Sequence, residues 1–137
     1  MAAISELIRT EDNGTISFGD YTLSAKAKKE DYEHEGDLYK VKTFHEITKL
    51  ERNGMFVYES VPGTAVTDFA VKDASVSFTV EGSADAQITV QLEDDMEYEI
   101  FTDGVAAGGM KTNMSGKLSL SVELSEGKSV AVKIVRR

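Results

Sequence analysis

The segment Lys117-Leu-Ser-Leu-Ser-Val-Glu-Leu124 alternates polar and apolar residues over its whole length. Successive residues of a β-strand point to opposite faces, so this segment has one apolar face and one polar face. The same period of two recurs in residues 76–81, 87–93 and 129–134. An apolar sheet face must be covered, and a second antiparallel sheet is the usual cover. The pattern therefore predicts an all-β fold, an antiparallel β-sandwich.

The C-terminal part has the strand count of an immunoglobulin-like sandwich. Gly, Asp and Asn recur between the apolar runs at intervals of about 8–12 residues, which suits tight turns between short strands. We expect seven strands there, near residues 65–70, 75–81, 86–93, 96–102, 109–113, 117–124 and 128–135. Their inward side chains should share one core, which we predict to contain Ile88, Val90, Leu118, Leu120, Val122, Leu124, Val132 and Ile134.

Residues 1–63 predict a less regular N-terminal β-region packed on the C-terminal β-sandwich of residues 64–137. The boundary falls at Pro62-Gly63, which holds the chain's single proline. A simple loop inside one domain explains the same two residues equally well, and both interpretations stay open. Asn53-Gly54 is the strongest hairpin signal in the chain, because both residues accept the positive φ of a type I′ turn.

Three N-terminal segments have patterns of their own. The charged stretch Lys28–Gly36 is typical of a solvated loop or of the extension of a strand. The segment Phe44–Leu50 has apolar residues three apart, yet its Thr and Ile residues favour a strand. The segment Met55–Val61 is apolar on both faces, so we expect it to be covered on both faces, by another layer or by another subunit.

The chain is acidic, with 24 Asp and Glu residues against 15 Lys and Arg residues and a net charge of −9. The acidic excess is similar in both halves, so neither half predicts binding to nucleic acid or to an anionic membrane. There is no cysteine, which excludes disulfides, thiolate metal sites and a cysteine nucleophile. The first residues do not have a signal-peptide pattern, and no segment approaches ~20 apolar residues. We therefore expect a cytoplasmic protein.

The sequence contains only incomplete versions of the motifs that are typical of catalysis and of metal binding. Gly127-Lys128-Ser129 does not have the upstream glycine of a phosphate-binding loop. His34 could join Glu33 or Asp37 at a metal ion, but neighbours on an extended chain point apart. Glu93-Asp94-Asp95 has the acid density of a calcium site, although it lies between two strands, where charged turns are common. We therefore predict no catalytic residue, no metal site and no cofactor.

Four aromatic residues are the best candidates for an interface or for a ligand-binding surface: Tyr39, Phe44, Phe56 and Tyr58. They cluster in the segment that also contains the two-faced strand. Sugar-binding proteins stack sugar rings on exposed aromatic side chains, so a ligand platform is one interpretation. A place in the core, or at the contact with a second subunit, is the other and is favoured.

Two stretches of the N-terminal region resemble a known family. They are Gly14-Thr-Ile-Ser-Phe-Gly-Asp-Tyr21 and the segment from Gly36-Asp-Leu-Tyr-Lys-Val-Lys-Thr-Phe44 to Thr64. Together they resemble a family of small, functionally uncharacterised proteins of gut clostridial Firmicutes, and the similarity runs along the whole chain. Members are often labelled "endosialidase", which implies a hydrolase that acts on glycans. The resemblance brings no established catalytic residues with it.

The residues favour a non-enzymatic, cytoplasmic β-sandwich protein that acts by binding or by self-assembly. Its predicted partner is a second copy of itself, in a homo-oligomer whose interface includes residues between Tyr39 and Val61. A carbohydrate-binding module or a small glycan-active hydrolase, with a glycan as partner, is the alternative. Sialidases grip the substrate carboxylate with several arginines, whereas this chain has four arginines and two of them are Arg136 and Arg137.

Overall fold

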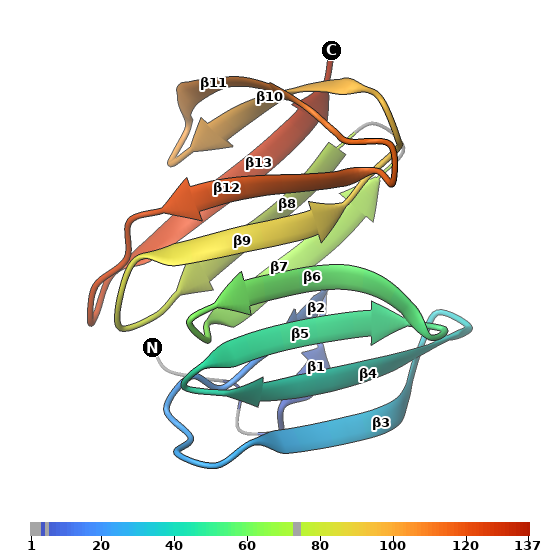
Figure 1. Cartoon of the computed structure of the whole chain (residues 1–137). Coiled ribbons are helices and arrows are strands. Elements are labelled where there is room, and N and C mark those ends of the chain that lie inside the picture. Colours follow the sequence, from blue (N-terminus) through green and yellow to red (C-terminus); the bar gives the residue numbers. More distant parts are fainter. Residues whose placement is uncertain (1–3, 5, 73–74) are drawn as a thin grey trace.

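The structure is a computed structural model that describes residues 4, 6–72 and 75–137. In these residues, thirteen β-strands form two antiparallel sheets and no helix occurs. Figure 1 shows one sheet in front of the other, with their strand directions crossing. The predicted all-β antiparallel sandwich is therefore confirmed. A membrane-crossing helix is likewise not found in the described part of the chain.

Sheet A has seven strands in the order β1-β2-β7-β8-β13-β10-β11, and sheet B has six in the order β12-β9-β6-β5-β4-β3. The strands of sheet A are β1 (Ile8–Thr10), β2 (Ile16–Phe18), β7 (Ala65–Lys72), β8 (Ser75–Glu81), β13 (Ser129–Arg136), β10 (Glu97–Thr102) and β11 (Val105–Lys111). The strands of sheet B are β12 (Lys117–Val122), β9 (Ala86–Gln91), β6 (Met55–Val61), β5 (Ile47–Arg52), β4 (Asp37–Phe44) and β3 (Ala27–His34).

One hydrophobic core fills the space between the sheets. All eight side chains that the alternation placed in a common core are buried in it, as predicted. Sheet A adds the rings of Phe18, Phe69 and Phe78, which surround Tyr58 of sheet B at centroid distances of 5.2, 6.3 and 5.7 Å. Edge-to-face contacts of this kind stabilise the fold beyond the burial of the rings. Tyr58 is thus the aromatic centre of the core.

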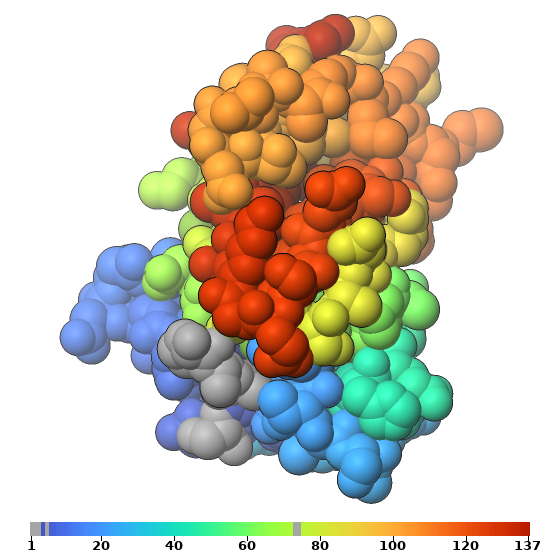
Figure 2. Space-filling view, turned by 90° about the vertical axis from the view of Figure 1, so that its left-hand side faces the viewer, coloured from blue at the N-terminus to red at the C-terminus, as the bar shows by residue number. Residues whose placement is uncertain are grey.

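The strands on the two sides of Pro62-Gly63 contribute to the same two sheets. Seven strands follow this point, as predicted, five of them in sheet A and two in sheet B, but β11 spans Val105–Lys111 and not the predicted 109–113. Strand β2 pairs with β7 in sheet A, and β6 pairs with β9 in sheet B. Seen from the side in Figure 2, the blue N-terminal residues lie in the lower part of the molecule and the orange C-terminal residues in the upper part. The pairings of β2 with β7 and of β6 with β9 thus join the two sequence regions by backbone hydrogen bonds within each sheet.

The chain crosses from sheet B to sheet A at Pro62-Gly63-Thr64, and buried hydroxyl groups hold this crossing. The N–H of Thr64 donates to the hydroxyl oxygen of Thr48 (3.0 Å), and this hydroxyl donates back to the carbonyl of Thr64 (2.9 Å). The Thr64 hydroxyl lies 2.9 Å from the phenol of Tyr58 and 2.8 Å from the hydroxyl of Ser60. Burial raises the pKa of the Tyr58 phenol, which therefore keeps its proton. The polar groups of the crossing are satisfied inside the core.

Gly63 has no room for a side chain. Its N–H donates to the carbonyl of His45 (3.0 Å), which brings its main chain close to the turn between β4 and β5. A Cβ atom at this position would collide with the carbonyl oxygen of Phe44. Space, and not an unusual φ, is therefore the reason for glycine at this position.

The two-faced pattern of β6 has a cause that the sequence did not predict. The register partners of Phe56 and Tyr58 are adjacent residues of β5, so Val57 is the extra residue of a β-bulge. Val57 therefore packs against the core beside Tyr58. No other layer of the described chain covers Met55 and Val61, which are 72% and 53% exposed. The expectation of an intramolecular cover on both faces is wrong, and cover by a second subunit stays a prediction.

The charged stretch Lys28–Gly36 lies mostly in β3, the edge strand of sheet B. Charged side chains are common on edge strands, because they discourage pairing with another chain. The stretch therefore forms a strand in its own right, and its interpretation as a solvated loop is wrong. The segment Phe44–Leu50 forms the turn from β4 into β5 and the first residues of β5, so the preference for strand over helix is confirmed.

We expect Gly63→Ala to lower the free energy of unfolding by about 3 kcal/mol or more, because a clash with main chain cannot be relieved by moving a side chain. Gly127→Ala is the control. Nothing lies within 4 Å of a Cβ atom there, and only its positive φ opposes alanine, at roughly 1–2 kcal/mol. Urea denaturation of both variants measures the difference. Equal losses would show that Gly63 is not packed against Phe44.

Candidate functional site

A groove of about 660 Å³ crosses the outer face of sheet A. It lies over β8 and β13, with the bulge of β7 on one side and β10 and the last residues of the chain on the other. Small-molecule and cofactor sites commonly have volumes of ~300–1,000 Å³ and a mainly apolar lining with a few polar groups. The groove therefore has the size of a ligand site.

The groove exists because the outer face of the two middle strands carries mostly small side chains, with Lys133 as the exception. Ser77 and Thr79 of β8 lie in register beside Lys133 and Ala131 of β13. On the next strand, Phe101 of β10 is the register partner of Lys133. The half-buried ring of Phe101 stands next to this low floor and lines the groove. The floor thus presents carbon atoms, two hydroxyl groups and the ammonium group of Lys133, beside an aromatic wall.

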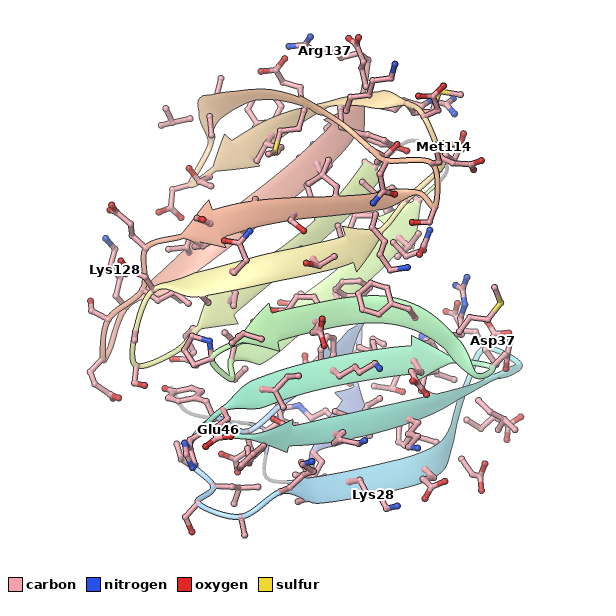
Figure 3. The ribbon with its side chains drawn as sticks, in the orientation of Figure 1. Lys28, Asp37, Glu46, Met114, Lys128 and Arg137 are labelled. Atoms are coloured by element: carbon pink, nitrogen blue, oxygen red, sulfur yellow. The ribbon has the colours of Figure 1, made fainter. Side chains whose placement is uncertain are left out.

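The wall near the C-terminus is held by an ion pair between Arg137 and Glu99. The guanidinium group donates through Nε (3.1 Å) and Nη2 (2.6 Å) to one carboxylate oxygen, and this contact raises the pKa of Arg137. The guanidinium lies against Gly109 of β11, where a Cβ atom would meet it. Figure 3 labels Arg137 at this end of the molecule. Glu99 is therefore held on the groove wall as a hydrogen-bond acceptor.

The opposite wall is formed by Asp68, which lies in the bulge of β7 with a φ of 56°. Its N–H donates to the hydroxyl oxygen of Ser17 (3.1 Å), and its carboxylate accepts from the hydroxyl of Thr15 (3.0 Å). Ser17 in turn donates to the carboxylate of Glu11, which also accepts from Nε of Arg9 at 2.9 Å. These two hydrogen bonds lower the pKa of Glu11. A chain of hydrogen bonds through β1 and β2 thus positions Asp68.

The groove can bind a molecule that is apolar on one face and rich in hydroxyl groups at its edges. Phe101 and Val135 offer carbon surface, and Ser77 and Thr79 offer hydroxyl groups that both donate and accept. The carboxylate of Asp68 offers an acceptor on the far wall. A sugar ring has this combination of surfaces, because its C–H groups form a face and its hydroxyl groups point outward.

The four aromatic residues predicted as binding candidates do not form one surface. Tyr58 and Tyr39 are buried in the core, and burial raises the pKa of the Tyr39 phenol as well. Phe44 and Phe56 are half-buried on the outer face of sheet B, with lysine ammonium groups over their rings at 5.7 and 5.0 Å from the centroids. They lie at opposite ends of that face. Only two separated rings therefore remain as surface candidates.

His34 and its acidic neighbours lie at a second hollow of about 340 Å³, at one end of the sandwich. Nδ1 of His34 lies 3.1 Å from the hydroxyl of Thr10, and Nε2 lies 3.8 Å from an oxygen of Glu35. Asp37, labelled in Figure 3, accepts from the amide of Asn53 at 2.9 Å. Within the described ranges, no group of three His, Asp or Glu residues has an arrangement that could hold a metal ion. His34 and Asp37 are therefore held by different neighbours, Thr10 and Asn53.

Reasoning from the sequence does not single out Phe101, Asp68 or Arg137. Their relation depends on the strand order of sheet A, which places β10, β13, β8 and β7 side by side. Alternation identifies the outward residues of each strand but not which strands are neighbours. The one signal in the sequence is the run of small outward residues in β8, from Ser75 to Thr79, because small outward residues leave a low place on a sheet.

Comparison of the chain with models of protein families, with curated proteins and with solved structures gives no match. The resemblance of its N-terminal stretches to the endosialidase-labelled family therefore stays a prediction. The function has to be inferred from the geometry of the faces themselves.

We expect the contribution of Glu11 to stability to depend on pH. Its pKa in the folded state is lowered, so its carboxylate stabilises the fold above about pH 4.5 and loses this effect as the pH falls through the lowered pKa. Glu11→Gln should therefore reduce the free energy of unfolding by about 1 kcal/mol at neutral pH and by less in acid. Urea denaturation at several pH values between about 3 and 7 measures both proteins. A difference that stays constant over this range would contradict the assignment.

Proposed function

We propose that the protein is a non-enzymatic β-sandwich of the cytoplasm that acts by binding, and that it holds a sugar chain in the groove of sheet A. The observation that carries the proposal is the half-buried ring of Phe101 beside a floor of small side chains. Outer faces of sandwiches are normally polar and solvated. A hollowed face with an aromatic wall is therefore a feature that folding alone does not require.

The arrangement of polar groups supports a sugar more than a wholly apolar ligand. Ser77 and Thr79 place hydroxyl groups on the floor, while Asp68 and Glu99 place carboxylates on opposite walls. A hydrocarbon ligand would leave the hydroxyl groups of Ser77 and Thr79 without partners once water is expelled, and it would satisfy no free lone pair of the two carboxylates, which is unfavourable. A sugar can give each of them a hydrogen bond while its C–H face covers Phe101.

We expect Phe101→Ala to weaken glycan binding by about 2- to 12-fold, the effect of losing one ring contact worth ~0.5–1.5 kcal/mol. Phe56→Ala is the matched control, because it removes a half-buried ring from the outer face of the other sheet. A glycan array identifies the ligand, and isothermal titration calorimetry compares wild type and both variants.

Equal losses in the two variants, or no glycan bound by the wild type, would refute the sugar groove. Cleavage of a glycan that disappears in Glu99→Gln or Asp68→Asn would refute the non-enzymatic part of the proposal. That result would assign the small glycan-active hydrolase instead, since paired carboxylates are the usual catalytic groups of such enzymes.

Self-assembly is the second candidate, and the edge strand β11 favours it. All seven residues of β11 are exposed, and the six from Val105 to Met110 carry no charge. The edges β1, β3 and β12 differ, because β1 has three residues, β3 is mostly charged, and every second residue of β12 is buried. An uncharged, exposed edge readily pairs with another chain. Pairing of β11 with a second copy by two-fold symmetry would give a homo-oligomer.

We expect Ala107→Lys to dissociate a homo-oligomer that is joined through β11, because a charge on the edge opposes strand pairing. Phe56→Glu should dissociate one that is joined through the segment between Tyr39 and Val61. Size-exclusion chromatography with light scattering measures the mass of the wild type and of both variants. A wild-type protein that runs as a monomer at micromolar concentration would contradict both arrangements.

A further inference from the structure

Three lysines lie side by side on the outer face of sheet B. Lys28 of β3 is the register partner of Lys42 of β4, and Lys42 is the partner of Lys49 of β5. Their strand neighbours Val41 and Leu50 are buried, so the three lysines point outward. Neighbouring strands lie ~4.8 Å apart, which sets the spacing of the row. Figure 3 looks onto this face, with Lys28 labelled on β3. We call these three residues the lysine row.

The lysine row opposes folding. Like charges that lie directly opposite each other on neighbouring strands destabilise a sheet. The chain has 24 acidic residues against 15 basic ones, so acidic partners for these positions are plentiful in its composition. A bound anion would remove the repulsion and turn the row into a favourable feature.

Acidic neighbours relieve the row only at its two ends. Nζ of Lys28 lies 3.6 Å from Glu30, and Nζ of Lys49 lies 3.6 Å from Glu51. Lys42, in the middle, has no carboxylate oxygen within 4 Å among residues 4, 6–72 and 75–137. An external anion therefore has its most favourable electrostatic interaction at Lys42, in the centre of the row.

A small hollow lies at this centre. Lys40, Lys42, Lys49 and Glu51 surround a volume of about 20 Å³. A single water molecule needs ~10–15 Å³ of such volume, so one oxygen atom of a carboxylate or sulfate group fits there. Lysine stems cover the strands around it while their ammonium groups remain accessible.

The row continues across the sheet as a track without further positive charge. Beyond Lys49 the successive register partners are Glu59, Thr89 and Ser119, which reach the far edge strand β12. The hydroxyl groups of Thr89 and Ser119 lie 2.8 Å apart and are exposed to further partners. One line of outward residues thus carries three ammonium groups at one end, the carboxylate of Glu59 next to Lys49, and hydroxyl groups at the other end.

From this geometry we propose that the outer face of sheet B binds a linear acidic polysaccharide along this line. Its carboxylate or sulfate groups contact the lysine row, and its uncharged hydroxyl groups contact Thr89 and Ser119. A polymer with an acidic group on each successive sugar matches a row with a fixed spacing near ~5 Å. The acidic groups of a folded protein surface have no such repeat. This site is separate from the groove on sheet A and does not depend on it.

Lys42→Glu is the decisive variant, because it converts the row into alternating charges. Its melting temperature should rise, since opposite charges then face each other across the strands. Its affinity for an acidic polysaccharide should fall by about tenfold or more. Lys128→Glu, in the turn before β13 and labelled in Figure 3, changes the net charge equally and should leave the affinity within about twofold of the wild type. A more stable variant that no longer binds excludes unfolding as the cause.

The probes are polygalacturonate, which carries carboxylates, and heparin, which carries sulfates, with dextran as the neutral polymer and poly(dT) as the nucleic acid. We expect binding to one or both acidic polysaccharides that weakens as salt increases, and none to dextran. The preferred probe identifies the acidic group. No binding to either, equal loss in Lys128→Glu, or poly(dT) bound as tightly would overturn the proposal. Binding that survives Phe101→Ala separates this site from the groove.

Discussion

The buried hydroxyl cluster around Thr64 is the interaction on which the relation of the two sheets depends. The chain leaves sheet B at Val61 and enters sheet A at Ala65, so only three residues span the two layers. Such a short crossing brings main-chain polar groups into the core, where water cannot reach them. Thr48 satisfies both the N–H and the carbonyl of Thr64 with one hydroxyl group. Removing that hydroxyl would leave two buried groups unpaired, which is far worse than losing one contact.

The same cluster fixes the two faces to which we assign functions. Thr48 also bonds to Thr43 at 2.8 Å, and this bond between β4 and β5 holds the register that sets Lys42 opposite Lys49. On the other side of the crossing, β7 begins at Ala65 and runs to the bulge that carries Asp68 to the groove. The lysine row and the groove wall therefore lie on strands that this cluster connects, although they are on opposite faces of the molecule.

Alternation was sufficient to predict the sandwich, the strands after Pro62 and the eight core residues, because each of these depends on local pattern and burial. It could not predict features that depend on pairing. Val57 alternates normally in the sequence, and only its register with β5 reveals the bulge. For Tyr58 the sequence left a place in the core, a subunit contact and a ligand platform open, and only the strand order shows that phenylalanines of three distant strands enclose it. The groove required the strand order of sheet A, which no single segment encodes.

The sequence also could not show which charges the fold brings together on one face. This local grouping matters more for binding than the net charge does. Counted along the sequence, acidic residues exceed basic ones in both halves, which argues against polyanions as partners. The fold gathers Lys28, Lys42 and Lys49 from three strands onto one face. Packed sheets lie ~10 Å apart, and the Debye length at physiological salt is ~8 Å, so charges exposed beyond sheet A are largely screened from the outer face of sheet B. A ligand at that face therefore responds mainly to the charges beside it and much less to the total of −9.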